Sequence, residues 1–254
     1  MLKKRIIPVL LLRDGRMVKG KQFQQYRDTG NPSTAVRIYS AQDADELVFI
    51  DIQATLASNQ ALKNILNAAA EECFMPLTAG GGITTLEQVR DLLLAGADKV
   101  IITTCAATNP EFITAVANRF GSQCVVAGID YKSSADGPKV WIRCGTELTD
   151  YEPITYAKYL VELGAGEIFL NAIDCDGMMQ GYDLAIANQV AEAVSVPVTI
   201  SGGAGNFSDL VEALGPKHGI SGAACSSLFH FGDNNPIRAR SHLRNLGIPM
   251  RVLK

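Results

Sequence analysis

The stretch Leu77-Thr78-Ala79-Gly80-Gly81-Gly82-Ile83 decides the fold, and Val198-Thr199-Ile200-Ser201-Gly202-Gly203-Ala204-Gly205 is its second copy. Each copy is a short apolar run followed by glycines and then by a polar residue that opens an amphipathic segment. This order predicts a strand, a tight turn and a helix. Glycines let the backbone approach a ligand closely, and a helix N-terminus favours an anion. Two matched copies therefore predict two phosphate-binding turns, although such glycines can also serve only to make tight turns.

Around these turns, apolar runs alternate with amphipathic segments along the whole chain. The expected strands are 5–12, 46–51, 76–79, 98–103, 123–130, 167–171, 197–201 and 219–225, and the expected helices are 33–44, 58–73, 85–95, 110–119, 153–163, 183–193, 206–214 and 236–245. Strands that are apolar throughout are typical of a sheet buried on both faces. Their alternation with helices over 254 residues predicts a (β/α)8 TIM barrel.

A doubly wound open sheet is the alternative fold, but the Gly-x-Gly-x-x-Gly turn of a dinucleotide fold does not follow the first expected strand. Two segments interrupt the alternation. We expect residues 16–31 to form a long polar loop and residues 131–150 to form an irregular loop or a small hairpin. A short helix is expected to start at Ser226-Ser227.

The sequence also repeats internally. Glu46-Leu47-Val48-Phe49-Ile50 aligns with Glu167-Ile168-Phe169-Leu170-Asn171 at an offset of 121, and the two glycine turns align at the same offset. Thr103-Thr104 aligns with Ser226-Ser227 at an offset of 123. We therefore expect residues 1–254 to form one barrel domain made of two half-barrels, roughly 1–121 and 122–254. One phosphate-binding turn in each half predicts a ligand with a phosphate at each end.

Composition excludes several classes of function. A net charge of −3 without a basic stripe argues against nucleic-acid binding, and the chain has no apolar run of the roughly 18 residues that a membrane span needs. The N-terminal apolar run is broken by Pro8 and lacks a small-residue cleavage site, so we expect it to be a first strand and not a signal peptide. Six scattered cysteines, mostly inside apolar runs, fit free buried thiols in a reducing cytoplasm.

No metal or cofactor is expected, because the three histidines have no ligand spacing. Asp174-Cys175-Asp176-Gly177 has the start of a calcium loop. However, Ala185 stands at the twelfth position, where such a loop needs a bidentate glutamate. We interpret this stretch as part of the phosphate-binding side of the site.

Over essentially its whole length the chain resembles the HisF family, the cyclase subunits of imidazole glycerol phosphate synthase. The stretches that carry the resemblance are Lys4-Arg5-Ile6-Ile7, Asp14-Gly15-Arg16, Val18-Lys19-Gly20, Asp45-Glu46-Leu47-Val48, Gly80-Gly81-Gly82-Ile83, Gly96-Ala97-Asp98-Lys99-Val100, Gly121-Ser122-Gln123, Asp174-x-Asp176-Gly177, Gly181-Tyr182-Asp183, Ser201-Gly202-Gly203-Ala204-Gly205 and Phe229-His230-Phe231. In that family a partner glutaminase releases ammonia, which passes up the barrel to a bisphosphate ribonucleotide at the opposite mouth.

The resemblance implies catalysis by two aspartates, at the ends of the first and fifth strands. Asp130 matches the second of them, but Leu11 occupies the position of the first. Leucine neither donates nor accepts a proton, and general acid–base catalysis is typically worth ~10²–10⁴-fold. Met178 and Asn171 also replace a threonine and a hydroxyl residue of the family pattern. The positions expected to bind the substrate or its phosphates are Lys19, Asp51, Gly82, Thr103, Thr104, Asn171, Asp176, Gly177, Ser201, Gly203, Ser226 and Ser227.

The opposite end of the barrel keeps the family pattern. Arg5, Glu46, Lys99 and Glu167 match the ring of four charges with which the family gates the ammonia path. Without that match, charges at strand starts are ordinary solvated pairs worth about 0–1 kcal/mol each. Asp98 and Gln123, on the same rim, are expected to contact a glutaminase.

Some residues of the family pattern are replaced and others are kept, and three functions are compatible with this combination. The first is a paralogue like those of surface-polysaccharide gene clusters, in which a HisH-like glutaminase partner supplies ammonia through the barrel to a sugar amidotransferase that makes an acetamidino sugar. The second is an authentic cyclase of histidine biosynthesis that uses a displaced acid. The third is a non-catalytic phosphate-binding assembly protein. The first is favoured, because the losses lie at the chemical mouth and the retained residues at the docking mouth.

Overall fold

Eight parallel strands close into a barrel in a computed structural model, which describes residues 3–53 and 56–251. In their order around the ring they are β1 (Arg5–Arg13), β4 (Leu47–Asp51), β5 (Leu77–Gly80), β6 (Lys99–Ile102), β7 (Val125–Lys132), β10 (Glu167–Ala172), β11 (Val198–Ser201) and β12 (Gly222–Cys225). The barrel closes because β12 pairs with β1 in parallel, Arg5 lying opposite Gly222. This architecture confirms the predicted (β/α)8 barrel.

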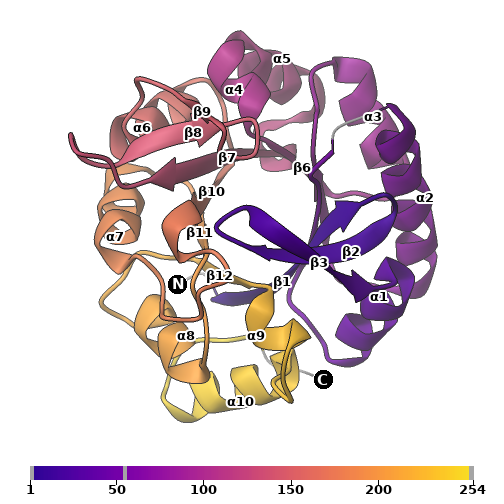
Figure 1. Cartoon of the computed structure of the whole chain (residues 1–254), viewed down its shortest axis with the longest axis vertical. Coiled ribbons are helices and arrows are strands. Elements are labelled where there is room, and N and C mark those ends of the chain that lie inside the picture. Colours follow the sequence, from indigo (N-terminus) through magenta and orange to yellow (C-terminus); the bar gives the residue numbers. More distant parts are fainter. Residues whose placement is uncertain (1–2, 54–55, 252–254) are drawn as a thin grey trace.

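The helices surround the strands in an outer ring (Figure 1). They are α1 (Pro32–Ala41), α2 (Leu56–Glu72), α3 (Leu86–Leu94), α5 (Glu111–Phe120), α6 (Pro153–Glu162), α7 (Leu184–Ala193), α8 (Phe207–Leu214) and α10 (Pro236–Asn245). Two short helices, α4 (Thr104–Thr108) and α9 (Ser227–His230), follow β6 and β12 directly, and η1 (Ser122–Cys124) and η2 (Ile173–Cys175) are single 3-10 turns. Of the two short helices, α9 was expected and α4 was not.

The prediction of a long polar loop at 16–31 is wrong. These residues form an antiparallel hairpin of β2 (Arg16–Lys21) and β3 (Gln24–Gly30), and β2 pairs with the end of β1. Met17 and Val18 are buried, and so is Lys19. The polar composition conceals the strand because its buried stretch is short and includes a charged residue, Lys19, beside the apolar Met17 and Val18.

The segment 131–150 forms the small hairpin that was one of its two expected conformations. The end of β7 pairs in antiparallel fashion with β8 (Lys139–Ile142), which pairs with β9 (Glu147–Leu148). At the end of the chain, the eighth barrel strand begins at Gly222, later than the expected start at 219. Both hairpins lie over the carboxyl ends of the barrel strands (Figure 1).

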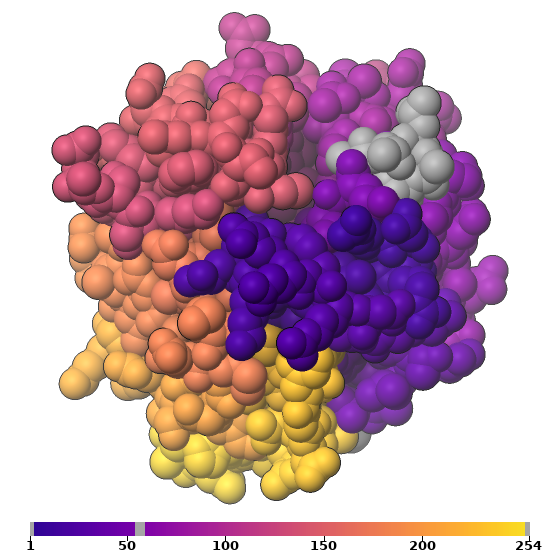
Figure 2. Space-filling model, in the orientation of Figure 1, coloured from indigo at the N-terminus to yellow at the C-terminus, as the bar shows by residue number. Residues whose placement is uncertain are grey.

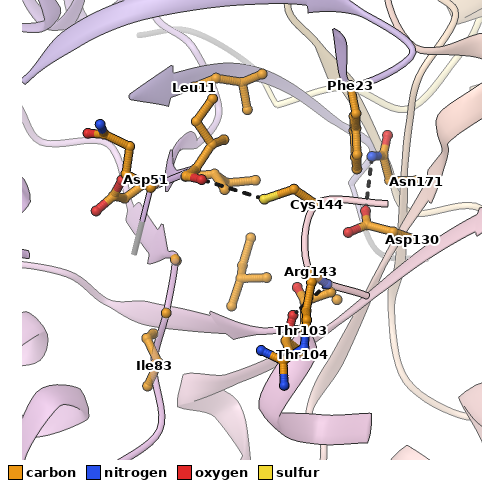
Figure 3. A pocket seen from close by; sticks show the side chains of 18 of the residues that line it. Leu11, Phe23, Asp51, Ile83, Thr103, Thr104, Asp130, Arg143, Cys144 and Asn171 are labelled. Carbon is orange, nitrogen blue, oxygen red and sulfur yellow. Dashed lines mark hydrogen bonds between the residues drawn. The ribbon is translucent and has the colours of Figure 1, made fainter. Parts of the chain in front are cut away.

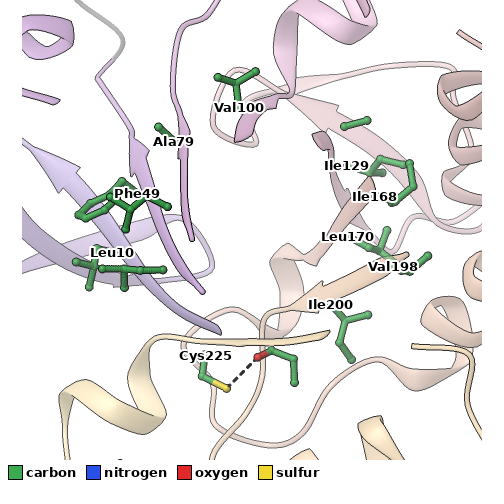
Figure 4. Close-up of a cluster of buried hydrophobic side chains, with 14 of the residues drawn as sticks. Leu10, Phe49, Ala79, Val100, Ile129, Ile168, Leu170, Val198, Ile200 and Cys225 are labelled. Carbon is green, nitrogen blue, oxygen red and sulfur yellow. Dashed lines mark hydrogen bonds between the residues drawn. The ribbon is translucent and has the colours of Figure 1, made fainter. Parts of the chain in front are cut away.

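Each barrel strand is buried on both faces, and β1 shows the pattern. Ile7, Val9 and Leu11 pack inside the barrel, whereas Ile6 and Leu10 pack between strands and helices. Figure 4 shows part of this outer layer, in which side chains of every other strand position meet the surrounding helices. Successive side chains of an apolar strand thus point alternately into the barrel and toward the helices, so each strand contributes to two apolar cores. The near-continuous apolar runs of the sequence predict this burial on both faces.

The two glycine turns have the same local structure. A Cβ atom on Gly81 (φ 119°) would lie 2.2 Å from the carbonyl oxygen of Asp51, and one on Gly202 (φ 89°) 2.5 Å from that of Ala172. Only glycine allows this close approach to the preceding strand. The helices after the turns begin with equivalent capping boxes, Thr85 with Gln88 and Asn206 with Asp209. The internal repeat is therefore a repeat of backbone geometry as well as of sequence.

All six cysteines are free thiols: Cys73, Cys105 and Cys225 are buried, Cys124 and Cys175 are half-buried, and Cys144 is exposed. Within residues 3–53 and 56–251, the helices include none that is long and apolar enough to cross a membrane.

Candidate functional site

A cavity of about 650 Å³ opens at the carboxyl ends of the barrel strands, and we call it the mouth cavity. Its floor is apolar and includes Val9, Ile101 and Phe169, which point into the barrel. Its walls are polar and come from the strand ends and the loops that follow them (Figure 3). In size and lining it is a typical small-molecule site.

Leu11 and Asp130 lie on opposite sides of the mouth cavity, because β1 and β7 are diametrically placed in the ring of strands (Figure 3). Leu11 is 9% exposed and can move no proton. Asn171 donates a hydrogen bond of 3.0 Å from Nδ2 to Oδ1 of Asp130. Burial raises the pKa of Asp130 to about 6, against the lowering effect of Asn171, and the charge of Asp176 adds to the rise. The geometry thus supplies one acid–base group, tuned close to neutral pH, without a partner on β1.

Lys19 and Asp176 form a buried ion pair at the edge of the mouth cavity. Lys19 Nζ lies 2.5 Å from Asp176 Oδ1, and both residues are more than nine-tenths buried. The backbone N–H of Gln22 also donates to the carbonyl oxygen of Asp176, at 2.8 Å. These contacts tie the β2–β3 hairpin to the loop after β10, across the mouth of the barrel. Lys19 is therefore part of a fixed strand, not of a free loop.

The structure brings most of the predicted substrate-binding residues together. Those that line the mouth cavity are Lys19, Asp51, Gly82, Thr103, Thr104, Asn171, Asp176, Ser201 and Ser226, whereas Gly177, Gly203 and Ser227 do not line it. The first glycine turn opens directly onto the cavity. The second is covered by the loop after β10, since a Cβ on Gly203 would lie 1.9 Å from the carbonyl oxygen of Gly181. Gly177 packs in the same way against the backbone of Gly20, and Ser227 is buried.

Phe23, Arg143 and Cys144 also line the mouth cavity. Of these, Phe23 and Cys144 were not singled out by sequence reasoning. Arg143 and Cys144 sit at the turn between β8 and β9 (Figure 3). The backbone N–H of Arg143 donates to Thr104 Oγ1 at 3.1 Å, and Cys144 Sγ donates to the carbonyl oxygen of Ile52 at 3.5 Å. Only the fold of the two hairpins carries these residues to the mouth, so no local sequence signal marks them.

At the opposite end of the barrel, the four predicted gate residues form a closed ring of ion pairs. We call Arg5, Glu46, Lys99 and Glu167 the gate ring. Arg5 lies 2.7 Å from Glu46 and 2.6 Å from Glu167, and Lys99 lies 2.8 Å and 2.9 Å from the same two carboxylates. The carboxylates are at most 9% exposed. Buried charges of this kind are tolerated only when each is paired and hydrogen-bonded.

Two threonines complete the hydrogen bonding of the gate ring. Thr78 Oγ1 donates to Glu46 at 2.6 Å, and Thr199 Oγ1 donates to Glu167 at 2.7 Å. Burial alone would raise the pKa of Glu167, but the charges and hydrogen bonds of Arg5 and Lys99 hold it below its usual value. The internal repeat relates the two glutamates to each other and the two threonines to each other, whereas both cations come from the first half of the chain. The threonines were not predicted, because a threonine in an apolar strand has no distinctive signal.

The rim around the gate ring carries the two predicted interface residues. Asp98 and Gln123 are exposed there, and Asp98 also accepts a hydrogen bond of 2.8 Å from the backbone N–H of Leu77. Phe74, just before β5, is fully exposed, and Leu94, at the end of α3, is 72% exposed. Exposed apolar side chains gathered on one rim are typical of protein-binding surfaces. Sequence reasoning missed Phe74, in the connection between α2 and β5, and Leu94, the last residue of α3, because a single apolar residue at such a position has no distinctive signal.

Among the described residues, there is no group of three or more histidine, cysteine, aspartate or glutamate side chains placed to hold a metal ion.

Comparison with known proteins places the chain in a family. A family model described as "Histidine biosynthesis protein" matches residues 5–235. The chain belongs to the histidine biosynthesis protein family. Membership of this family indicates a barrel protein of the HisA/HisF type. The match spans both glycine turns and all four residues of the gate ring.

Asp130→Asn should stabilise the protein at neutral pH by about 3 kcal/mol, since it removes a buried carboxylate whose ionisation is unfavourable. The folded pKa of Asp130, about 6, lies above its usual value of 3.8. The penalty is therefore absent in acid and grows as the pH rises from about 4 to about 6. Urea unfolding of both proteins from pH 4 to 8 should show a gap that widens over that window and then stays constant. A gap independent of pH would show that Asp130 ionises normally.

Proposed function

We propose that this family member is a HisF-like subunit that docks a HisH-like glutaminase at the gate ring and passes ammonia through the barrel. The observation that carries the proposal is the contact among all four charges of the gate ring. Each of the two cations bridges both carboxylates, so the ion pairs span this end of the barrel. Because the ring is built from side chains alone, it can open by movement of one of them without unfolding a strand.

The barrel interior suits the passage of a neutral molecule. Between the gate ring and the floor of the mouth cavity lies one apolar layer, made of Ile7, Val48, Val126 and Ala224. Ammonia is neutral and about the size of water, so apolar surroundings exclude it only weakly. Ammonium is excluded, because the cost of desolvating an ion is several kcal/mol even after relaxation. This layer supports delivery of ammonia in its reactive form.

The ammonia acceptor in this proposal lies on another protein. Leu11 breaks the acid–base pair on which the cyclase reaction depends, although Asp130 is kept. The sequence resemblance to paralogues of surface-polysaccharide clusters points to a sugar amidotransferase as the acceptor enzyme. The phosphate-binding turn that opens on the mouth cavity would then hold a phosphorylated small molecule whose role is to signal or to position, and not to be cyclised.

The docking part of the proposal predicts a strong effect of Phe74. The full chain and a HisH-like glutaminase should form a one-to-one complex, with glutaminase activity higher than that of the free glutaminase. Phe74→Arg should weaken the complex at least tenfold, because it places a charge in the apolar part of the interface. Titration calorimetry and a glutaminase assay measure the two effects.

Phe231→Arg is the matched control, because Phe231 is also an exposed aromatic residue but follows α9, at the other mouth of the barrel. It should bind glutaminase as the unmodified protein does. Equal weakening by both variants, or no complex with any HisH-like glutaminase, would contradict the proposed docking face.

An authentic cyclase remains the second candidate, and one observation favours it. The mouth cavity is large enough for a nucleotide-sized ligand and keeps Asp130 with a pKa of about 6, which suits proton transfer near neutral pH. In that case another group must replace the missing aspartate.

A further inference from the structure

The turn between β8 and β9, residues 143–146, reaches over the mouth cavity, and we call it the tip turn. Figure 2 shows its hairpin (pink) meeting the β2–β3 hairpin (indigo) over the mouth of the barrel. The backbone N–H of Arg143 and the thiol of Cys144 hold the tip turn to the segments after β6 and β4. On a third side, Lys132 Nζ, at the end of β7, donates to the carbonyl oxygen of Gly145 at 2.8 Å. The tip turn is therefore a fixed part of the cavity wall.

The backbone of the tip turn is strained. Arg143 (φ 50°), Cys144 (φ 56°) and Gly145 (φ 73°) are consecutive residues in the left-handed region, which residues other than glycine seldom adopt. Strain of this kind persists only where the surroundings fix it, and it is concentrated at catalytic and ligand-binding sites. Here it fixes the point from which the Arg143 side chain leaves the backbone, beside the mouth cavity.

The charges that line the mouth cavity leave Arg143 as its available cation. Among the described residues of the lining, the carboxylates are Asp51, Asp130 and Asp176, and the cations are Lys19 and Arg143. Lys19 is already paired with Asp176, and that pair is buried. An anionic ligand would otherwise meet mainly carboxylates. Arg143 is therefore the side chain that can make the cavity favourable for such a ligand.

The guanidinium group of Arg143 has unused donors. Its Nε donates to Glu147 Oε2 at 2.8 Å, and the two side chains are 61% and 52% exposed. No hydrogen bond within residues 3–53 and 56–251 uses its two Nη groups. An exposed ion pair of this kind contributes little to stability, so a bound anion can replace Glu147. Two parallel N–H donors are the arrangement that binds two oxygens of one phosphate.

Strand register brings the tip turn close to the first glycine turn. Gly80, where that turn begins, lies opposite Ile101 on β6, so the glycines after it and Thr103-Thr104 follow two neighbouring strands at the same level. The tip turn is bonded to Thr104, and Figure 3 shows Arg143 beside Thr103 and Thr104. The first glycine turn is the one that opens onto the mouth cavity. A phosphate held there thus lies on the side of the cavity from which Arg143 extends.

We propose that Arg143 binds the phosphate group of the mouth ligand, exchanging Glu147 for it and completing the phosphate site of the first glycine turn. This inference rests on the phosphorylated small molecule of the proposed function, and not on glutaminase docking or ammonia passage. The glycines let neutral backbone N–H groups approach the ligand, and Arg143 adds the positive charge that balances the phosphate. Arg143 is then a specificity-determining residue, since it selects phosphorylated molecules over their neutral counterparts.

Titration of the full chain with ribose 5-phosphate, followed by ³¹P NMR, tests the proposal. Arg143→Gln should weaken binding about tenfold or more, because it removes a charged hydrogen-bond donor to the phosphate. Arg143→Lys should recover only part of the loss, since it restores the charge but not the paired donors. Neither change removes the backbone hydrogen bond from position 143 to Thr104, so the tip turn keeps this anchor.

Glu147→Gln should have the opposite effect and tighten binding about twofold, because Glu147 then no longer competes for the guanidinium group. In the Arg143→Gln protein the same change should leave binding nearly unaltered, since no cation is left to be released. A purely structural role for Arg143 predicts no such dependence of one substitution on the other.

Arg16→Gln is the matched control, since Arg16 also forms an exposed ion pair, with Asp28, on the other hairpin and does not line the mouth cavity. It removes the same charge and should bind ribose 5-phosphate as the unmodified protein does. Equal weakening by both variants, or normal binding by Arg143→Gln, would overturn the role of Arg143 and leave the proposed function intact. If the unmodified protein does not bind ribose 5-phosphate, both this role and the phosphorylated ligand of the proposed function are wrong, whereas glutaminase docking is measured separately.

Discussion

The purified protein should convert the bisphosphate ribonucleotide of HisF cyclases at least ~100-fold more slowly than its Leu11→Asp variant, with ammonium as the nitrogen source at alkaline pH. The change places a carboxylate opposite Asp130, the acid–base residue that the family resemblance implies, on the other side of the mouth cavity. The cyclase reaction that the family resemblance implies uses two carboxylates, one on each side of the substrate. Release of the aminoimidazole product, followed by absorbance, measures the rate.

Leu11→Asn is the control for this experiment, because asparagine has the size of aspartate but cannot exchange a proton at neutral pH. It should be as slow as the unmodified protein. Turnover by the unmodified protein close to that of Leu11→Asp would contradict the ammonia-delivery proposal and would favour the cyclase with a displaced acid. If neither protein turns over while glutaminase docking is intact, Asn171 and Met178 become the next positions to restore.

Glu167→Ala should lower the free energy of unfolding by about 3–5 kcal/mol, the range found when one partner of a buried ion pair is removed. Arg5 and Lys99 would then share a single carboxylate, Glu46, and Thr199 Oγ1 would lose its acceptor. Chemical denaturation at pH 7 measures the loss. Glu147→Ala is the control, since Glu147 pairs with Arg143 in an exposed position and should contribute less than about 1 kcal/mol.

The pH dependence of this loss has a defined sign. The folded pKa of Glu167 lies below its usual value of 4.5, so its stabilising effect is complete above that pH. It is lost as the pH falls through the folded pKa. The difference in stability between the unmodified protein and Glu167→Ala should therefore shrink below pH 4.5. A difference that stays constant down to pH 3 would show that the carboxylate is not held in its charged form by the gate ring.

The barrel itself could be predicted from the sequence, because its two determinants are local. Apolar runs buried on both faces and two glycine turns at a fixed offset need no knowledge of distant contacts. The hairpin at 16–31 could not be predicted, because its buried stretch includes Lys19, whose burial depends on an ion pair with Asp176 in the other half of the chain. In the sequence alone, a lysine that is buried in the fold cannot be distinguished from a surface lysine until its ion-pair partner is known.

The site residues that lie at the ends of barrel strands could be predicted from the family pattern. The site residues that lie in hairpin turns over the mouth could not. Asp130, Leu11 and the gate ring sit at positions set by strand register. Arg143 and Cys144 enter the mouth cavity only because β8 and β9 fold back across it. The covering of the second glycine turn by the loop after β10 is equally a long-range contact, so the sequence alone predicts two open turns where the structure has one.

The origin of the two cations in the gate ring limits how this protein can be rebuilt. Arg5 and Lys99 both belong to residues 1–121, and the strand register places Cys124 and Gly222 at the equivalent positions of the other half. A barrel assembled from two copies of the first half would bring four cations to face two carboxylates. One assembled from two copies of the second half would have two carboxylates and no cation. Charge balance at this end therefore exists only in the fused, asymmetric chain, and engineering by half-barrel exchange would have to restore it at Cys124 and Gly222.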